Sequence, residues 1–175
     1  MNLSQAIDAY KRDHRPRLEA MKRFYESMSL TQAIENAATG KDPSGKMNSH
    51  QRRVGYVKGR LGAAQLSEHI DGIKKCSSFD EIFAITENVR KDVYGLGDLW
   101  SYDTALRIGF KLQRYPREVY IQCGVVKGLK KLFPGKRAAR SILRSEFPKV
   151  LRHMQAYEIE NFLCIWGKSS KKRGC

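Results

Sequence analysis

The sequence is organised around the stretch Gly95-Leu96-Gly97-Asp98-Leu99-Trp100-Ser101-Tyr102-Asp103-Thr104-Ala105-Leu106-Arg107-Ile108-Gly109. Two glycines at alternate positions, Gly95 and Gly97, predict a tight hairpin, because glycine accepts positive φ and leaves its backbone N–H groups open to a ligand. A helix is predicted from about Asp103 to Leu112, so that Asp103 opens it. A glycine turn followed by a helix N-terminus suits a phosphate best, and the stretch therefore points towards nucleic acid.

The net charge of the chain supports an anionic partner. Its 175 residues include 33 Lys and Arg against 18 Asp and Glu, a formal net charge of +15. This excess is larger than solubility requires, and it favours nucleic acid as the partner. We expect this nucleic acid to be DNA. Charge alone leaves a ribosome-like role and a membrane-surface role open.

The spacing of apolar residues predicts an all-α fold, a compact single-domain helical bundle with a central glycine hairpin. The domain is expected over residues 1–166, followed by a disordered basic tail over residues 167–175. Gly59 and Gly62 share a small-residue helix face with Gly55, against which another element is expected to pack. Ser78 and Glu81 form a capping box that starts a helix. Helices are predicted over residues 3–28 with a break near Pro16, 30–38, 50–75, 79–91, 103–112, 116–120, 125–133, 136–147 and 157–164.

Cysteines and histidines lack the spacing of a metal site. The sequence holds no Cys-x-x-Cys pair and no pair of histidines at ligand spacing, so we expect neither a metal nor another cofactor. Scattered cysteines are typical of a reduced, cytoplasmic protein. The absence of a long apolar run predicts no membrane contact, and we expect a monomer. The residues concerned are Cys76, Cys123, Cys164 and Cys175, with His14, His50, His69 and His153.

A first basic cluster follows a loop that resembles a phosphate-binding motif. The segment from Gly40 to Lys46 has most of that motif, but Met47 stands where a magnesium-binding hydroxyl is required, and a helix precedes it instead of a strand. We therefore expect a polar loop between helices. The cations and polar side chains after it are either a phosphate-binding helix start or a solvated helix end. This cluster comprises Lys46, His50, Gln51, Arg52 and Arg53.

A second basic region lies in the last third of the chain, with Glu146 as its one acid. Arg137, Arg140 and Arg144 stand at positions i, i+3 and i+7 of a predicted helix and would share one face. Because acids do not neutralise this face, it favours a sequence-independent contact with the phosphate backbone over a merely solvated surface. The region also contains Lys127, Lys130, Lys131, Lys136, Lys149 and Arg152.

The segment from Tyr102 to Gly109 resembles the Val-Asp-Thr-His-Val-x-Arg-(Val/Ile) segment of the helix-hairpin-helix DNA glycosylase superfamily. Tyr94-Gly95-Leu96-Gly97 is similar to that superfamily's Pro-Gly-(Val/Ile)-Gly hairpin, and the resemblance covers about twenty residues. It implies that Gly95 and Gly97 hold a DNA phosphate, that Asp103 faces the sugar of a flipped nucleotide, and that Arg107 belongs to the DNA-binding set. No lysine stands beside the hairpin in the sequence, which implies a monofunctional enzyme without a lyase step.

Cleavage of an N-glycosidic bond builds positive charge on the deoxyribose, and a carboxylate facing the sugar stabilises that charge. Asp103 is the candidate for this role, and its alternative is a helix cap. A flipped base also needs a pocket with stacking and hydrogen-bonding side chains, for which the candidates are Trp100, Tyr102, Tyr120 and Gln122. For Trp100 and Tyr120, packing in the core is the alternative.

The resemblance thus implies a monofunctional DNA glycosylase that acts on double-stranded DNA with a modified or damaged base, in repair or in anti-phage defence. The alternatives are a non-catalytic DNA- or RNA-binding helical module and an enzyme that processes small anionic nucleotides or sugars. The base that is recognised is not determined by these residues.

Overall fold

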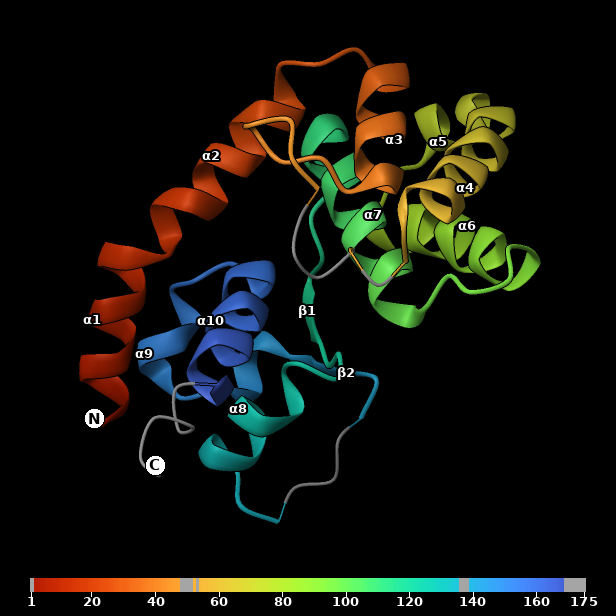
Figure 1. Cartoon of the computed structure of the whole chain (residues 1–175). Helices are drawn as coiled ribbons and strands as arrows, with labels where there is room; N and C mark the ends of the chain where they lie inside the picture. Colours follow the sequence, from red (N-terminus) through yellow and green to blue (C-terminus); the bar gives the residue numbers. More distant parts are fainter. Residues whose placement is uncertain (1, 48–51, 53, 136–138, 169–175) are drawn as a thin grey trace, which may run out of the picture. The chain divides into compact units, whose positions relative to one another are not determined.

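The computed structural model describes residues 2–47, 52, 54–135 and 139–168 of the chain, and these residues are mostly helical (Figure 1). They form ten α-helices, one short 3-10 helix and a single pair of short strands. The all-α prediction is confirmed, although the two strands were not predicted.

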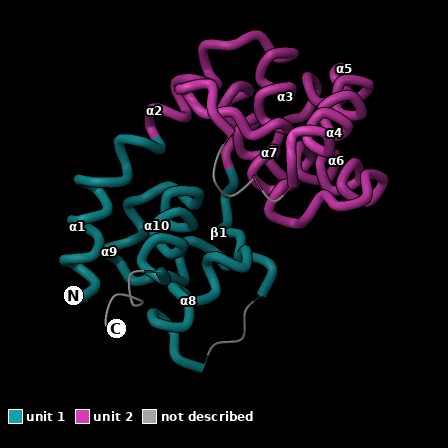
Figure 2. The backbone as a smooth tube through the Cα atoms, viewed as in Figure 1, with its two compact units in different colours: residues 1–18, 116–175 teal, residues 19–115 magenta. Residues whose placement is uncertain are grey.

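The backbone forms two compact units, shown in Figure 2. Unit 1 comprises Met1–Leu18 and Pro116–Cys175, and unit 2 comprises Glu19–Tyr115. A single domain over residues 1–166 stays a prediction.

Unit 2 holds the central stretch of the sequence. Its helices are the second part of α2 (Arg15–Glu26), α3 (Leu30–Thr39), α4 (Tyr56–Glu68), α5 (Ile70–Lys75), α6 (Phe79–Asp92) and α7 (Asp98–Leu112). Helix α7 packs against both α6 and α3, and α4 packs against α3. Because α6 and α3 pack against it, α7 is buried along most of its length, including Trp100, Tyr102 and Ile108.

Two glycines of α4 allow this close packing. A Cβ atom on Gly59 would lie 3.0 Å from the Ala38 carbonyl oxygen of α3, and one on Gly62 would lie 2.5 Å from the Trp100 ring. The distance at Gly62 is shorter than real Cβ atoms show, and the distance at Gly59 is tighter than nine in ten of their contacts, so glycine lets α4 approach its neighbours. The predicted small-residue face is therefore confirmed at these two positions, whereas Gly55 faces open space.

Capping side chains fix the start of α6, as predicted. The Ser78 hydroxyl accepts a hydrogen bond from the Glu81 backbone N–H at 3.3 Å. The Glu81 carboxylate accepts one from the backbone N–H of Ser77, at 2.8 Å, one residue earlier than an ideal capping box requires. This contact and one from the Ser77 hydroxyl lower the pKa of Glu81.

Unit 1 packs around its last helix. Its elements are α1 (Leu3–Asp13), the start of α2, β1 (Glu118–Tyr120), α8 (Val126–Leu132), β2 (Ser141–Leu143), η1 (Arg144–Glu146), α9 (Lys149–Arg152) and α10 (Ala156–Lys168). Helix α10 packs on α8, β1 and α1, and its residues Ile159, Phe162 and Leu163 are buried in the unit's apolar core. Helix α10 continues through Lys168, two residues into the predicted tail, and residues 169–175 lie outside the described part.

An ion pair between a buried carboxylate and a half-exposed arginine also joins elements of unit 1. Glu158 of α10 is almost fully buried, and its carboxylate lies 2.8 Å from the Arg15 guanidinium. The other carboxylate oxygen accepts a hydrogen bond from the Gln155 backbone N–H at 2.8 Å. A buried carboxylate is tolerated only with such partners, so the contact fixes the start of α2, beyond the break at His14, to α10.

The prediction of two helices in unit 1 is wrong. Residues 118–120 form β1 instead of a helical turn, and residues 141–143 form β2 inside the segment predicted as helix 136–147. The two strands are antiparallel, with Val119 opposite Ile142 and both side chains in the core. Pairing between segments about twenty residues apart outweighs the local helical spacing.

Candidate nucleic-acid interface

Positive charge is concentrated in unit 1. This unit contains 18 Lys and Arg but only 6 Asp and Glu, so it carries +12 of the chain's net charge of +15. Two of its six acids, Glu158 and Glu160, are buried. In the part of unit 1 that the structure describes, exposed cations therefore outnumber exposed acids.

Three arginines of unit 1 line one hollow. The hollow has a volume of about 350 Å³ and is open to solvent. All three arginines are exposed, and none of the lining residues is acidic. The Arg152 guanidinium is held in place because its Nε donates a hydrogen bond to the Phe147 carbonyl at 2.6 Å. The lining residues are Arg117, Leu143, Arg144, Ser145 and Arg152.

The strand register explains why these arginines meet. Glu118 lies opposite Leu143 in the antiparallel pair, so Arg117 and Arg144 come one step beyond the last paired residues, at the same end of the two-stranded sheet. Helix α9 then brings Arg152 to this end. Arg117 and Arg144 are 27 positions apart in the sequence, and Arg144 and Arg152 are 8 positions apart. The strand pairing and α9 bring the three side chains together.

This arrangement corrects the predicted arginine face. Arg140 and Arg144 were expected on one side of a helix, but they flank the two ends of strand β2. Arg144 instead shares the hollow with Arg117, which the sequence analysis did not include in the site. The predicted Arg137 lies outside the described residues, and Lys127 is exposed at the start of α8.

The four predicted base-pocket residues fall in different parts of the structure. Trp100 and Tyr102 are buried in unit 2, where the Trp100 indole N–H donates to the Ala38 carbonyl at 2.8 Å and Tyr102 packs edge-on against Phe79 and Phe83. Trp100 therefore packs in the core, which was the alternative to its predicted place in a base pocket. Tyr120 lies in β1 of unit 1, and Gln122 follows it. Both are half-buried.

The loop from Gly40 to Lys46 closes around the carboxylate of Asp42. Asp42 Oδ1 accepts hydrogen bonds from the Ser44 hydroxyl at 2.6 Å, from the Ser44 backbone N–H at 2.9 Å and from the Lys46 backbone N–H at 3.0 Å. The Ser44 hydroxyl, followed by the backbone N–H groups, lowers the pKa of Asp42. The N–H groups that a phosphate would need are therefore already bound, as expected of a polar loop. Lys46 and Arg52 are exposed, and His50, Gln51 and Arg53 lie outside the described residues.

The central hairpin adopts its predicted turn at only one of its glycines. Gly95 has φ of +91°, whereas Gly97 is extended with φ of −105° and stands at the N-cap of α7. Helix α7 begins at Asp98, so the prediction that Asp103 opens the helix is wrong. Asp103 lies in the second turn and does not cap the N-terminus.

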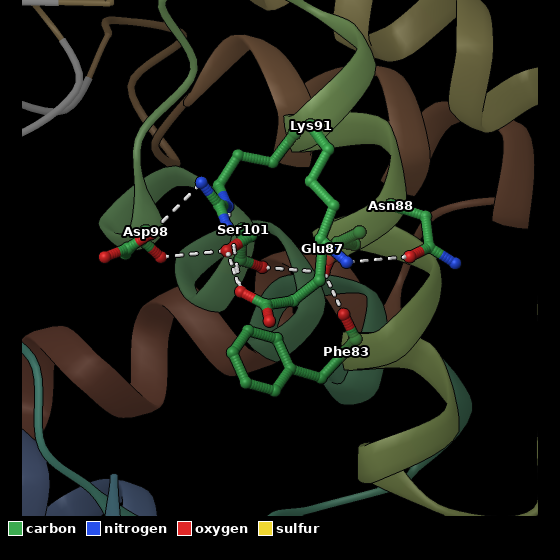
Figure 3. A network of polar contacts seen from close by, with 8 residues as sticks. Phe83, Glu87, Asn88, Lys91, Asp98 and Ser101 are labelled. Carbon is green, nitrogen blue, oxygen red and sulfur yellow. Dashed lines mark hydrogen bonds and ion pairs between the residues drawn. The ribbon is translucent and has the colours of Figure 1, made fainter.

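A polar network fixes the start of α7 to α6 (Figure 3). The Ser101 hydroxyl donates to the Asp98 carbonyl at 2.9 Å and lies 3.3 Å from the Glu87 carboxylate. Arg90 bridges the carboxylates of Glu87 and Asp98, at 3.7 and 3.3 Å. The hairpin between the two helices is thereby held at both of its ends.

Asp103 forms an ion pair one turn along α7. Its Oδ2 lies 3.5 Å from Nη2 of Arg107, and the side chain of Asp103 is 20% exposed. Nη1 of Arg107 donates to the Ala37 carbonyl at 3.2 Å, and the arginine side chain is only 8% exposed. Arg107 is thus a structural cation of unit 2 that positions Asp103, and it presents no open guanidinium to a phosphate.

Sequence reasoning also missed a cation beside the hairpin. Lys58 of α4 lies against Gly95, and its ammonium nitrogen is 5.7 Å from the centre of the Tyr94 ring. Lysine and hairpin are 37 residues apart in sequence, so no local pattern signals their contact. No lysine stands next to the hairpin in the sequence, but the fold places Lys58 beside it.

No three His, Cys, Asp or Glu side chains group as a metal site within the described ranges. In that same part of the chain, none of the helices has both the length and the apolar composition that crossing a membrane requires.

Comparisons of the chain with protein-family models, with curated proteins and with solved structures found no match.

Proposed function

We propose that this chain binds DNA through the phosphate backbone, with the arginine hollow of unit 1 at the centre of the interface. The observation that carries the proposal is the convergence of Arg117, Arg144 and Arg152 around one open hollow without an acidic lining residue. Guanidinium groups present several N–H donors in a plane and bind phosphate oxygens in pairs. The +12 net charge of unit 1 attracts the polyanion from a distance.

Contacts of this kind position a protein on DNA without reading its sequence. The affinity should therefore fall steeply with salt and vary little between sequences, because binding releases condensed counterions. A site for one small anion would not show this steep dependence on salt.

The test measures the affinity of the full chain for a fluorescent DNA duplex by anisotropy, between about 50 and 200 mM salt. The variant Arg117→Glu/Arg144→Glu reverses two cations of the hollow and leaves Arg152, which holds the Phe147 carbonyl, in place. We expect weaker binding to every duplex and a salt dependence reduced by about two phosphate contacts.

The matched control is Arg23→Glu/Lys74→Glu, which makes the same change in net charge on exposed cations of unit 2. We expect a much smaller loss of affinity in this control. Equal losses in the two variants, or a wild-type affinity that does not respond to salt, would contradict the proposed interface.

Base excision with Asp103 is a second candidate function. The observation that favours it is a partly exposed carboxylate that a buried arginine holds in one orientation. A carboxylate that stabilises a sugar cation must be both oriented and reachable. The family resemblance of residues 102–109 supplies the reaction class.

The variant Asp103→Asn tests this second candidate. We expect it to fold and to bind DNA, while abasic sites no longer form on duplexes that carry modified bases. Strand breaks in the wild type should appear only after alkali. Breaks without alkali that are lost in Lys58→Gln would instead assign a lyase step to the lysine beside the hairpin. Wild-type excision in Asp103→Asn, or no excision from any bound duplex, would eliminate Asp103 as the catalytic carboxylate.

A further inference from the structure

The second surface with unusual chemistry lies on unit 2, where α4 and the central hairpin meet. Among the described residues, seven large apolar or aromatic side chains are exposed, and five of them come from α4, the hairpin and the first turn of α7. These five are Tyr56, Val57, Leu61, Tyr94 and Leu99, which together with Lys58 and Arg60 we call the tyrosine surface. Lys58 adjoins the hairpin, whereas Tyr56 and Arg60 lie about half a turn away around α4.

Tyr94 is the most exposed of these side chains. It is 94% exposed at the tip of the hairpin, and the adjacent Gly95 has positive φ. The polar network at the start of α7 and the contact of Lys58 with Gly95 hold the hairpin from both sides. The turn therefore presents an aromatic ring whose surface is almost entirely exposed.

Each tyrosine of the surface has a cation beside its ring. Lys58 lies 5.7 Å from the centre of the Tyr94 ring, and the Arg60 guanidinium lies 5.7 Å from that of Tyr56, which is 47% exposed. Helix α4 carries no acid before Glu68, at its last residue. The surface thus combines ring faces for stacking with positive charge for an anionic backbone.

We propose that the tyrosine surface binds unpaired bases of single-stranded DNA, with Tyr94 as the main stacking residue. This inference rests on the proposed DNA binding and adds the strand state that unit 2 recognises. Bases stack on aromatic side chains in proteins that bind single strands, while neighbouring cations contact the phosphates. The cation beside each ring and the lack of acids in α4 before Glu68 favour an anionic strand as the partner.

The test uses the full chain and two fluorescent DNA probes, a single strand and the matched duplex. In Tyr94→Ala we expect single-strand affinity to fall on the order of tenfold, the loss typical of one stacked base, with duplex affinity nearly unchanged. Tyr94→Phe keeps the ring and should retain single-strand binding. Tyr56→Ala should show a smaller loss, because less of its ring is exposed. A single strand carrying 2-aminopurine reports stacking directly through quenching, which Tyr94→Ala should abolish.

The control variant is Val150→Ala, which shortens an exposed apolar side chain of unit 1 and should change neither affinity. Unchanged single-strand binding in both tyrosine variants would overturn the inference and leave phosphate binding by unit 1 intact. A wild type that binds neither probe would overturn the proposed function itself. Sedimentation that shows self-association of the wild type, lost in Tyr94→Ala without a change in DNA binding, would assign the surface to protein contacts and also overturn the inference.

Discussion

Arg107 links two helices of unit 2 through one guanidinium, since Nη1 donates to the Ala37 carbonyl of α3 while Nη2 pairs with Asp103 of its own helix. The arginine is the buried member of the pair, and the aspartate is the partly exposed one. The contact therefore orients the carboxylate from inside the unit, while the Asp103 side chain stays 20% exposed.

Replacing Arg107 should destabilise unit 2. Arg107→Met keeps the length of the side chain but removes the charged donor from the Ala37 carbonyl and from Asp103. We expect a loss of about 2–3 kcal/mol in the free energy of unfolding, measured by circular dichroism in urea. Arg114→Met, at an exposed position beyond α7, should cost less than about 0.5 kcal/mol. A similar small effect at Arg107 would show that the guanidinium does not stabilise the unit.

Trp100 should be both a stability determinant and a protected fluorophore. Trp100→Phe removes the indole donor of the 2.8 Å hydrogen bond to Ala38 and leaves a buried carbonyl without that partner. The expected cost is about 1–3 kcal/mol. In a Trp166→Phe background, the remaining Trp100 fluorescence should resist acrylamide quenching, because Trp100 is buried. Ready quenching in the native state would contradict this burial.

Gly62 and Gly72 offer a matched pair of glycine substitutions. Gly62→Ala places a methyl group 2.5 Å from the Trp100 ring, whereas Gly72→Ala in α5 meets no atom within 4 Å. We expect Gly62→Ala to lower stability by about 1–3 kcal/mol through overpacking. Gly72→Ala should raise it by about 0.5–1 kcal/mol, since alanine favours helices more than glycine does. Thermal unfolding of both variants gives the comparison, and equal effects would refute the close approach of α4 to α7.

The Asp42 loop should respond to acid. Its hydrogen bonds lower the pKa of Asp42 in the folded state below the ordinary value of 3.8. A lowered pKa contributes stability that is present above the unfolded value and is lost as pH falls through the folded value. Unfolding of the wild type and Asp42→Ala in urea should therefore show a stability difference that is constant near neutral pH and shrinks below 3.8. A difference that grows on acidification would reverse the assigned direction of the shift.

Much of the local structure follows from short-range sequence signals. Asn2, Ser29 and Ser78 each cap the helix that begins after them, and Pro16 falls in the first turn of α2, where a proline is tolerated. The loop around Asp42 is also local, because Ser44 and Lys46 lie within four residues of that carboxylate. Such features depend on neighbours in the chain. The cap at Ser78, the break near Pro16 and the polar loop were predicted, whereas the caps Asn2 and Ser29 were not.

The start of α7 shows where local signals are insufficient. Asp98 and Asp103 both stand at plausible helix starts in the sequence. The contacts of Ser101 with Glu87 and of Arg90 with Asp98 come from α6 and favour a helix that begins at Asp98. The choice between two local solutions was therefore made by a neighbouring helix, and it moves Asp103 from a cap to an ion pair with Arg107.

By itself, the sequence determined the helical character of the chain, its excess of positive charge and the small-residue face of α4, because each depends on residue type and spacing. Tertiary structure alone decided which side chains lie near these cations. The antiparallel register of β1 and β2 brings Arg117 next to Arg144, and the packing around the hairpin brings Lys58 to Tyr94. Both arrangements depend on contacts between residues more than twenty positions apart, whose free energy comes from burying Val119, Ile142 and Trp100 and is not encoded in any local period.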